Sequence, residues 1–385
     1  MIKMIDVNQC CGCGNCAIVC SKEAIQLKLN DDGFWYPCVD KNKCIKCGAC
    51  SKYCPVINDD DSFLEEFGIH GYFGRHKDVE VLKSCSSGGI ATALAEYVIA
   101  ELNGIVYGAA YAENFSYVKT VRIDKLEDLE QLKGSKYIQC LKFNIFKSIK
   151  DDLENGKNVL YIALPCDIAA LMQYLKKKYD LLYTVDMICH GPTSVFAFRD
   201  YLKIKVKKEK IIKFSMRYKK DSNWTPYYLY IETDNKRIVT ERFWSSDFGY
   251  VFNRFARKYC YSCRFKGPFR FSDLTIGDAW GAPETLIDNN NSGLSSIVVN
   301  TQKGLALLKN NPRIILYDTD VSSIINGNLN LTEKRKITKE WDYISKHLKS
   351  VGLKKTIKGL KPLKKRVLET AYLLKCSILE GLRKK

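Results

Sequence analysis

The sequence lacks several features that would place it in a familiar class. It contains four histidines, and His70, His76 and His347 follow no pattern, so we expect structural roles for them. No apolar run is long enough to span a bilayer, and the first residues lack the apolar segment of a secretory signal. No stretch matches a nucleic-acid-binding motif. We therefore expect a cytoplasmic protein that does not bind nucleic acid.

Acidic residues are outnumbered: 61 Lys and Arg face 43 Asp and Glu, which gives a formal net charge of +18. This excess favours acidic partners, such as an anionic membrane face or an acidic electron carrier like a ferredoxin. The length of 385 residues predicts two or three domains. It leaves the oligomeric state open.

Cysteine, by contrast, is abundant, with 17 residues, and eight of them form two copies of one pattern near the N-terminus. Each copy reads C-x2-C-x2-C-x3-C, the bacterial spacing for a pair of 4Fe–4S clusters in which the fourth cysteine of each run serves the other cluster. The predicted ligands of one cluster are Cys10, Cys13, Cys16 and Cys54, and those of the other are Cys44, Cys47, Cys50 and Cys20. Gly12, Gly14 and Gly48 stand between ligands, where the backbone must bend tightly.

Zinc and disulfides are the alternatives for these cysteines. Zinc sites are usually built from two separated C-x2-C pairs, so the doubled run of four favours iron and sulfur. A disulfide framework is disfavoured because no secretory signal precedes the cysteines. Cys11 and Cys38 fall outside the pattern and have no predicted role.

The chain predicts three parts: a dicluster ferredoxin-like domain over residues 1–58, an α/β domain over 70–331 and a helical basic tail over 332–385. The acidic stretch 58–61 is the expected linker. Helices and strands then alternate, which favours a mainly parallel sheet covered by helices, mixed α/β overall. Strands are expected at 71–75, 104–110, 159–163, 181–188 and 272–281, helices at 90–101, 126–132, 143–155 and 168–177, and a hairpin around Asp234 and Asn235.

Two loops are candidate phosphate sites. Ser86, Ser87, Gly88 and Gly89 precede a predicted helix, whose first backbone amides would be free to bind an anion. An ordinary serine-capped helix start explains the same residues equally well. The second loop holds phosphate or ribose, or is a solvated turn, and its candidate residues are Lys133, Ser135, Lys136 and Tyr137.

Four further cysteines lie far apart in the sequence. Cys166 and Cys189 each follow a predicted strand, at the edge where ligands gather in open α/β sheets, and Cys260 and Cys263 form a C-x2-C half-site. Together they predict a third metal site, although unrelated buried thiols remain the alternative. Asp278 ends another predicted strand and is a candidate site residue.

Two basic segments are candidate docking surfaces. Residues 203–220 carry nine Lys or Arg opposed only by Glu209, which predicts a solvated edge or a surface for an acidic redox partner. From Gly352 onward, basic residues accompany apolar ones at helical spacing. That segment lies on an anionic membrane face or, as we slightly prefer, packs on its own domain.

Several motifs follow one another along the chain: the two cysteine runs, the loops at 86–89 and 133–137, Pro165-Cys166, Cys189-His190-Gly191, the C-x2-C at 260–263 and residues 273–281. In this order, they closely resemble the coenzyme F420 hydrogenase/dehydrogenase beta-subunit family. The resemblance covers nearly residues 1–330. It implies a flavoprotein in which FAD places its pyrophosphate at 86–89 with 133–137 as a second contact. It also implies that Cys166, Cys189, Cys260 and Cys263 hold an extra cluster.

We therefore expect an iron–sulfur flavoprotein oxidoreductase that binds two 4Fe–4S clusters and FAD. The resemblance implies a third cluster. Its hydride acceptor or organic substrate would be a deazaflavin coenzyme or a compound of polysaccharide synthesis. The flavin would convert one-electron traffic into two-electron chemistry. The alternative is an electron-transfer subunit or adaptor that carries clusters for a partner enzyme without substrate chemistry of its own. The sequence identifies no catalytic residue.

Overall fold

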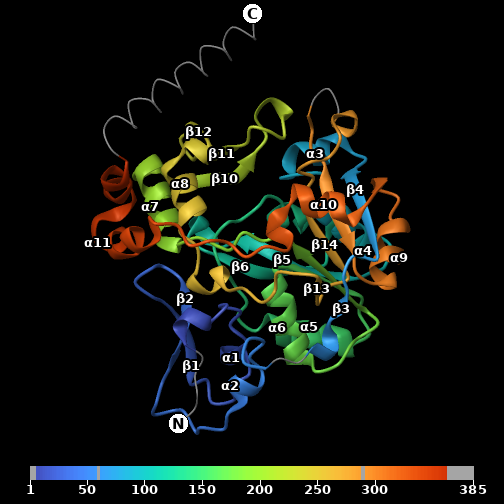
Figure 1. The fold of residues 1–385 in the computed structure, drawn as a ribbon, viewed down its shortest axis with the longest axis horizontal. Coiled ribbons are helices and arrows are strands. Elements are labelled where there is room, and N and C mark those ends of the chain that lie inside the picture. Colours follow the sequence, from blue (N-terminus) through green and yellow to red (C-terminus); the bar gives the residue numbers. More distant parts are fainter. Residues whose placement is uncertain (1–5, 59–60, 288–290, 362–385) are drawn as a thin grey trace, which may run out of the picture.

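A large sheet forms the centre of the computed structural model, which describes residues 6–58, 61–287 and 291–361 (Figure 1). Within these residues its strand order is β16-β4-β15-β14-β9-β8-β5-β6-β7. Four central strands are mutually parallel, namely β5 (Ile105–Tyr111), β8 (Val159–Ala163), β9 (Leu182–Met187) and β14 (Leu274–Asp278). The flanking strands are β4 (His70–His76), β6 (Val118–Ile123), β7 (Cys140–Leu141), β15 (Ser295–Val299) and β16 (Ile314–Thr319). The parallel part thus covers the centre, and antiparallel pairing of β6 with β5 and of β15 with β14 extends it on the two sides.

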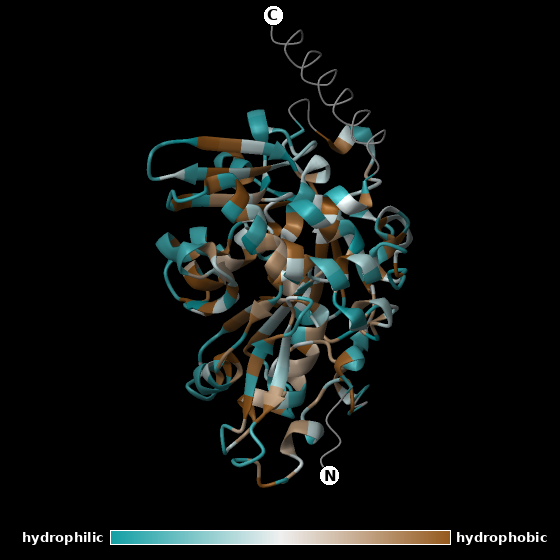
Figure 2. Ribbon diagram, turned by 90° about the vertical axis from the view of Figure 1, so that its left-hand side faces the viewer, coloured by the Kyte–Doolittle hydropathy of each residue, from teal (hydrophilic) through white to brown (hydrophobic). Residues whose placement is uncertain are grey.

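Helices cover both faces of this sheet. On one face, α4 (Ile90–Ala100) and α9 (Gln302–Lys309) pack on alternate strand residues such as Leu160. On the other, α5 (Ile145–Glu154) and α6 (Pro165–Leu175) pack on the intervening ones, such as Tyr161. Because both faces of the central strands are buried, their sequences are continuous apolar runs. Figure 2 shows hydrophobic colour on the inner elements and hydrophilic colour on the outer loops. The predicted α/β fold is confirmed.

A smaller antiparallel sheet stands beside the large one and consists of β10 (Ile211–Tyr218), β11 (Tyr228–Thr233) and β12 (Ile238–Arg242). The predicted hairpin around residues 234–235 is the β11-β12 connection. Helices α7 (Val195–Val206), α8 (Asp247–Arg254) and α11 (Trp341–Leu360) share one core with this sheet. The start of the predicted tail therefore packs on its own domain, and residues 362–385 lie outside the described residues. No helix in the described part of the chain is both long and apolar enough to cross a membrane.

The remaining described elements are short. Strands β3 (Glu65–Glu66) and β13 (Phe269–Arg270) pair with each other, and helices α3 (Val79–Ser84) and α10 (Val321–Gly327) lie beside β4. The predicted helix at 126–132 is a 3-10 helix. Helix α6 starts at Pro165, three residues earlier than expected, because proline at the first helical position costs no hydrogen bond. As a result, Cys166 lies in the first turn.

The N-terminal module repeats its local structure along with its cysteine pattern. Helix α1 (Asn15–Ile18) begins after Gly14, with φ 82°, and helix α2 (Ala49–Lys52) begins after Gly48, with φ 78°. An antiparallel hairpin, β1 (Ile25–Leu29) and β2 (Trp35–Val39), separates the two copies. Glycine adopts this left-handed conformation without steric cost, so the predicted tight bends are confirmed.

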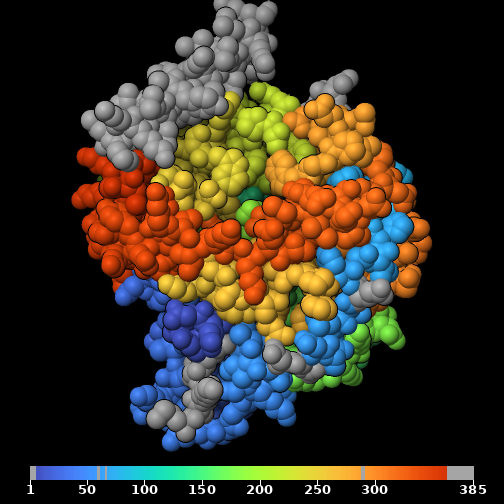
Figure 3. Space-filling model, viewed as in Figure 1, coloured from blue at the N-terminus to red at the C-terminus, as the bar shows by residue number. Residues whose placement is uncertain are grey.

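The module forms a lobe at one end of the molecule (Figure 3). It joins the large domain through specific polar contacts. Asn15 Nδ2 donates to the Ala170 carbonyl on α6 at 3.1 Å, and Asn58 Nδ2 donates to Gln173 Oε1 at 3.1 Å. Helix α1 therefore lies against α6, as Figure 1 shows.

Candidate functional site

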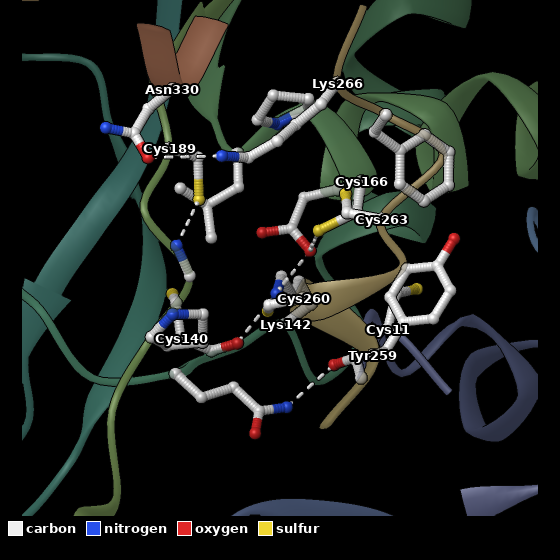
Figure 4. A pocket seen from close by; sticks show the side chains of 18 of the residues that line it. Cys11, Cys140, Lys142, Cys166, Cys189, Tyr259, Cys260, Cys263, Lys266 and Asn330 are labelled. Atoms are coloured by element: carbon white, nitrogen blue, oxygen red, sulfur yellow. Dashed lines mark hydrogen bonds and ion pairs between the residues drawn. The ribbon is translucent and has the colours of Figure 1, made fainter. Parts of the chain in front are cut away.

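Four cysteines that are distant in the sequence line one cavity: Cys166, Cys189, Cys260 and Cys263 (Figure 4). We call them the cavity cysteines. Two of them follow the carboxyl ends of the neighbouring parallel strands β8 and β9, as the sequence predicts, because such strands end at the same edge. The C-x2-C half-site lies in and after a 3-10 helix, Lys258–Tyr261, whose Tyr259 also lines the cavity.

The cavity depends on a glycine. Gly191 has φ 90°, and a Cβ atom at this residue would lie 2.9 Å from both Cβ and Sγ of Cys260. Any other residue would push the Cys189 loop away from the C-x2-C segment. Gly191 also donates its backbone N–H to Cys189 Sγ at 3.2 Å. The Cys-His-Gly sequence thus brings two of the cavity cysteines together.

Burial perturbs the cavity thiols. It raises the pKa values of Cys189 and Cys260, and with the proximity of Cys189 it raises the pKa of Cys263 to about 11. The Cys11 thiol lowers the pKa of Cys166, but burial and the adjacent Asp167 raise it to about 12 on balance. A metal that takes these sulfurs as thiolates must therefore displace protons, so its binding is favoured by rising pH.

Cationic groups surround the same cavity. Lys142 and Asp167 form an ion pair with 2.6 Å between Nζ and Oδ1, and both side chains are almost fully buried. Lys142 Nζ also donates to the Cys140 carbonyl at 2.8 Å. Lys266 lines the cavity, and Arg335 is close enough to interact with Cys260 and Cys189. These cations favour a group of net negative charge in the cavity.

A second cavity lies in the N-terminal module. Its lining includes the first predicted ligand set, Cys10, Cys13, Cys16 and Cys54. Cys54 comes from the second copy of the pattern, so the cavity combines residues of both copies, as the crossing assignment predicts. Burial raises the pKa of Cys54 to about 11 and also raises the pKa of Cys16.

The other predicted set lies toward the surface. Cys47 is exposed, while Cys20 and Cys44 are half-buried. Cys50, also half-buried, lines the cavity of the first set as well. The backbone N–H of Ala24 donates to Cys20 Sγ at 3.3 Å, the type of contact that adjusts a cluster's potential.

Cys11, which has no predicted role, connects the two cavities. It lines both of them, and its thiol lies between those of Cys13 and Cys166 and interacts with each. Gly12 also lines both. The segment between the first two cysteines of the module is thus the wall that the cavities share.

Arg257 fixes that wall in place. Its fully buried guanidinium donates to the carbonyls of Cys10 and Trp35 and to Gln139 Oε1, each at 2.8 Å. A Cβ atom on Gly12 would lie 2.6 Å from Arg257 Cζ. Arg257 stands three residues before Cys260, so one side chain sets the spacing between the module and the cavity.

No group of three or more His, Cys, Asp or Glu among the residues that the structure describes is arranged to hold a single metal ion. A four-iron cluster differs in this respect, because each thiolate binds a separate iron and the four sulfurs stand apart around the cluster.

The predicted flavin residues meet on the other side of β14, around Arg217. This buried guanidinium donates to both carboxylate oxygens of Asp278 at 2.7 and 3.1 Å, to Tyr137 Oη at 3.2 Å and to the Ser86 carbonyl at 3.0 Å. Ser86 Oγ in turn accepts from the backbone N–H of Ser135 at 2.7 Å. Both predicted loops and Asp278 therefore form one site.

The lysines of this site serve the backbone. Lys136 Nζ donates to the carbonyls of Leu132, Lys133 and Gly134, and burial lowers the pKa of Lys136 to about 8. Lys133 pairs with Glu130 at 2.8 Å. Lys219 Nζ donates to three carbonyls, including that of Ser87 at 2.8 Å. Lysine thus shapes both loops.

Ser87, Gly88 and Gly89 complete the first loop. Ser87 Oγ donates to the Leu294 carbonyl, and the Gly88 N–H donates to Ser295 Oγ at 3.0 Å, which ties the loop to β15. Gly89, with φ 75°, precedes α4 and provides no side-chain cap. The first backbone N–H groups of α4 therefore have no hydrogen bond with the side chain of the residue before the helix.

Sequence reasoning missed Arg217, Arg257 and Lys142. Arg217 lies in the basic stretch 203–220, where a count of charges predicts solvent exposure, yet the inward face of β10 buries it. Arg257 precedes the C-x2-C by three residues, and this proximity is the one sequence signal that could have identified it. Lys142 had no signal in the sequence.

Two comparisons with known proteins found a match. Residues 156–316 match the sequence profile of a family described as the C terminus of the beta subunit of coenzyme F420 hydrogenase/dehydrogenase. A chain from a xenon-derivatised F420-reducing NiFe hydrogenase complex of Methanosarcina barkeri is similar with a TM-score of 0.46 and 16% identity, over 79% of this chain and 97% of that chain. None of the curated proteins matches. The segment that contains all four cavity cysteines and Asp278 is therefore similar to the C-terminal part of the beta subunits of F420 hydrogenases and dehydrogenases, and this points to a redox protein.

Proposed function

We propose that this chain is an iron–sulfur flavoprotein oxidoreductase that passes electrons between 4Fe–4S clusters and FAD, and from FAD to a hydride acceptor or organic substrate. The observation that carries the proposal is the shared wall of the two cysteine-lined cavities, in which Cys11 and Gly12 line both. Neighbouring clusters at these positions would form a continuous electron path.

The residues fit clusters by their donor chemistry. Thiolates are the usual ligands of four-iron clusters, and each cavity has four of them from the predicted sets. The cations Lys142 and Lys266 would offset the negative charge of a cluster held by the cavity cysteines. Arg257 would hold the two clusters at a fixed separation through its bonds to Cys10 and its place in the chain next to Cys260.

The residues around Arg217 fit the phosphates of FAD. The N-terminus of α4 offers backbone amides and the positive end of a helix dipole. Arg217 Nε is buried and has no hydrogen-bond partner within the described residues, so a cationic N–H is left for a ligand. FAD bound here would exchange electrons singly with a cluster and in pairs with a substrate. The substrate would be a deazaflavin coenzyme or a polysaccharide-pathway compound.

Iron and flavin analysis of anaerobically purified protein tests the proposal. We expect bound FAD and about twelve irons, and replacing Cys166 or Cys263 with Ser should remove about four. Cys38→Ser is the matched control, because this exposed residue lies outside every predicted set. Unchanged iron in the Cys166→Ser and Cys263→Ser variants would reject the third cluster.

Arg217→Met tests the flavin site separately. We expect it to lower the FAD content while the iron content stays the same, because Arg217 lies with the predicted flavin loops. The control is Arg237→Met, since Arg237 pairs with Glu209 on the surface hairpin. Full iron with no flavin in the unaltered protein would favour the electron-transfer subunit over the oxidoreductase.

A further inference from the structure

The second copy of the cysteine pattern carries an exposed basic loop, residues 41–47. We propose that this loop is the docking surface for an acidic one-electron carrier protein of the ferredoxin type. The inference rests on the proposed function, since it takes Cys44 and Cys47 as ligands of the outer cluster. It assigns to this loop the docking role that the sequence assigned to residues 203–220.

The charge of the loop is not neutralised. Lys41, Lys43 and Lys46 are all exposed, and none of them forms an ion pair with another described residue. The preceding carboxylate, Asp40, accepts from the backbone N–H of Asn42 at 3.0 Å. Three free ammonium groups on seven residues create a positive field that attracts an acidic surface and accelerates its encounter.

An apolar residue stands in the middle of these lysines. The exposed fraction of Ile45 is 60%, although isoleucine is among the residue types most often buried. A docking surface commonly combines an apolar centre with a polar, charged rim. Cys47, exposed in the same loop, would place a cluster ligand directly beneath a docked partner.

The module contacts the large domain through residues other than those of the basic loop. The contacts that join it to the large domain start from Cys10, Asn15, Trp35 and Asn58, outside the basic loop. At the position that corresponds to Gly12, the second copy has Lys46, with φ 58°. Gly12 faces Arg257, whereas Lys46 faces solvent. The outer cluster is therefore the one an external carrier can approach.

The basic stretch 203–220 fits this role less well. Arg217 and Lys219 are buried, and Lys205 pairs with Glu241 at 2.9 Å. Lys207 and Lys208 are exposed, but Arg237 and Glu209 pair beside them. No cysteine occurs within residues 203–220. Lys207, Lys208 and Lys210 of this stretch are exposed and belong to no predicted cluster or flavin site, so they supply the matched control.

The step at the loop is a single electron transfer. One electron crosses per encounter, so the carrier loses or gains one electron and the outer cluster gains or loses the same one. No bond forms or breaks. The reaction therefore needs proximity and orientation of the two centres, which charge complementarity provides.

The test compares two charge-reversed triple variants of the full chain, purified without oxygen. One is Lys41→Glu, Lys43→Glu and Lys46→Glu, and the control is Lys207→Glu, Lys208→Glu and Lys210→Glu. The probe is an acidic ferredoxin, whose affinity is measured calorimetrically in the oxidised state and whose electron-transfer rate is measured by stopped flow. Dithionite, a small reductant that needs no docking surface, is the second reductant.

We expect the loop variant to bind the ferredoxin at least about tenfold more weakly and to lose most of the salt dependence of the rate, whereas the control changes little. Reduction by dithionite and iron content should stay at the unaltered protein's values. Ile45→Ser should weaken binding without a change of charge, which keeps the test valid if the triple variant folds poorly. Unchanged affinity in the loop variant and in Ile45→Ser, with full iron, would overturn the docking surface alone. An unaltered protein without iron would overturn the proposed function instead.

Discussion

Gly12 and Lys46 hold the same position in the two copies of the cysteine pattern, and both have a positive φ, 79° and 58°. The first copy turns this position toward Arg257, where a Cβ atom would lie 2.6 Å from the guanidinium carbon. The second copy turns it to solvent. The pattern fixes the local backbone in both copies, and the surroundings decide which side chain each can carry.

The same contrast extends to the thiols. Cys13 is 7% exposed, lies beside Cys11 and lines the cavity of the N-terminal module, whereas its counterpart Cys47 is exposed. One copy therefore faces the interior and the other faces solvent. Under the proposed function, the inner copy would relay electrons and the outer copy would contact a carrier, and variants of either copy test this contrast.

The largest effect is expected from Arg257→Met. It leaves the carbonyls of Cys10 and Trp35 without their buried donor, so we expect a loss of about 4 kcal/mol in the free energy of unfolding. The measurement is thermal unfolding of the anaerobic protein. Arg237→Met, on the exposed hairpin, should change stability by less than about 0.5 kcal/mol. Equal melting temperatures for the two variants would contradict the role of Arg257 in holding the first copy.

Thiol reactivity in iron-free protein should separate the copies next. At pH 8 we expect Cys47 to be alkylated about a hundredfold faster than Cys13, because interaction with Cys11 and burial raise the pKa of Cys13 well above its ordinary value. Burial raises the pKa of Cys54 to about 11, so its alkylation should accelerate as the pH rises toward 11 and then level off. Mass spectrometry of modified peptides measures both. Similar rates at Cys13 and Cys47 would remove the contrast.

The smallest effect is expected from alanine at the shared position. Gly12→Ala introduces strain at φ 79° and a contact with Arg257, so we expect it to destabilise the protein by about 2 kcal/mol. Lys46→Ala should change stability by less than about 0.5 kcal/mol, since no contact of its side chain is lost. Thermal unfolding compares them directly. A larger loss for Lys46→Ala would reverse the assignment of inner and outer copies.

Periodicity predicted much of the fold. The apolar run at 159–163 is β8 to the residue, and the hairpin around Asp234 and Asn235 formed as expected, because both signals are local. The antiparallel strands that extend the sheet on both sides were less visible. Their place depends on pairings between distant segments, such as β4 with β15 and β16, which no local pattern encodes.

The sites divide in the same way. Strand ends and a C-x2-C spacing made Cys166, Cys189, Cys260 and Cys263 candidate ligands, and the structure places all four around one cavity. The sequence did not identify Arg217, because a single arginine that points into the protein cannot be told from the exposed lysines around it. It also left Cys11 unassigned, since its place between two cavities arises only when the module docks on α6.

The most direct test of the account is the route by which electrons reach the flavin. In the double variant Cys44→Ala and Cys47→Ala, flavin reduction by an acidic ferredoxin should fall close to zero, while iron at the cavity cysteines and reduction by dithionite persist. The measurement is stopped-flow bleaching of the flavin absorbance under anaerobic conditions. A double variant that accepts electrons from ferredoxin as fast as the unaltered protein would contradict the path from the outer copy through the inner one to the cavity.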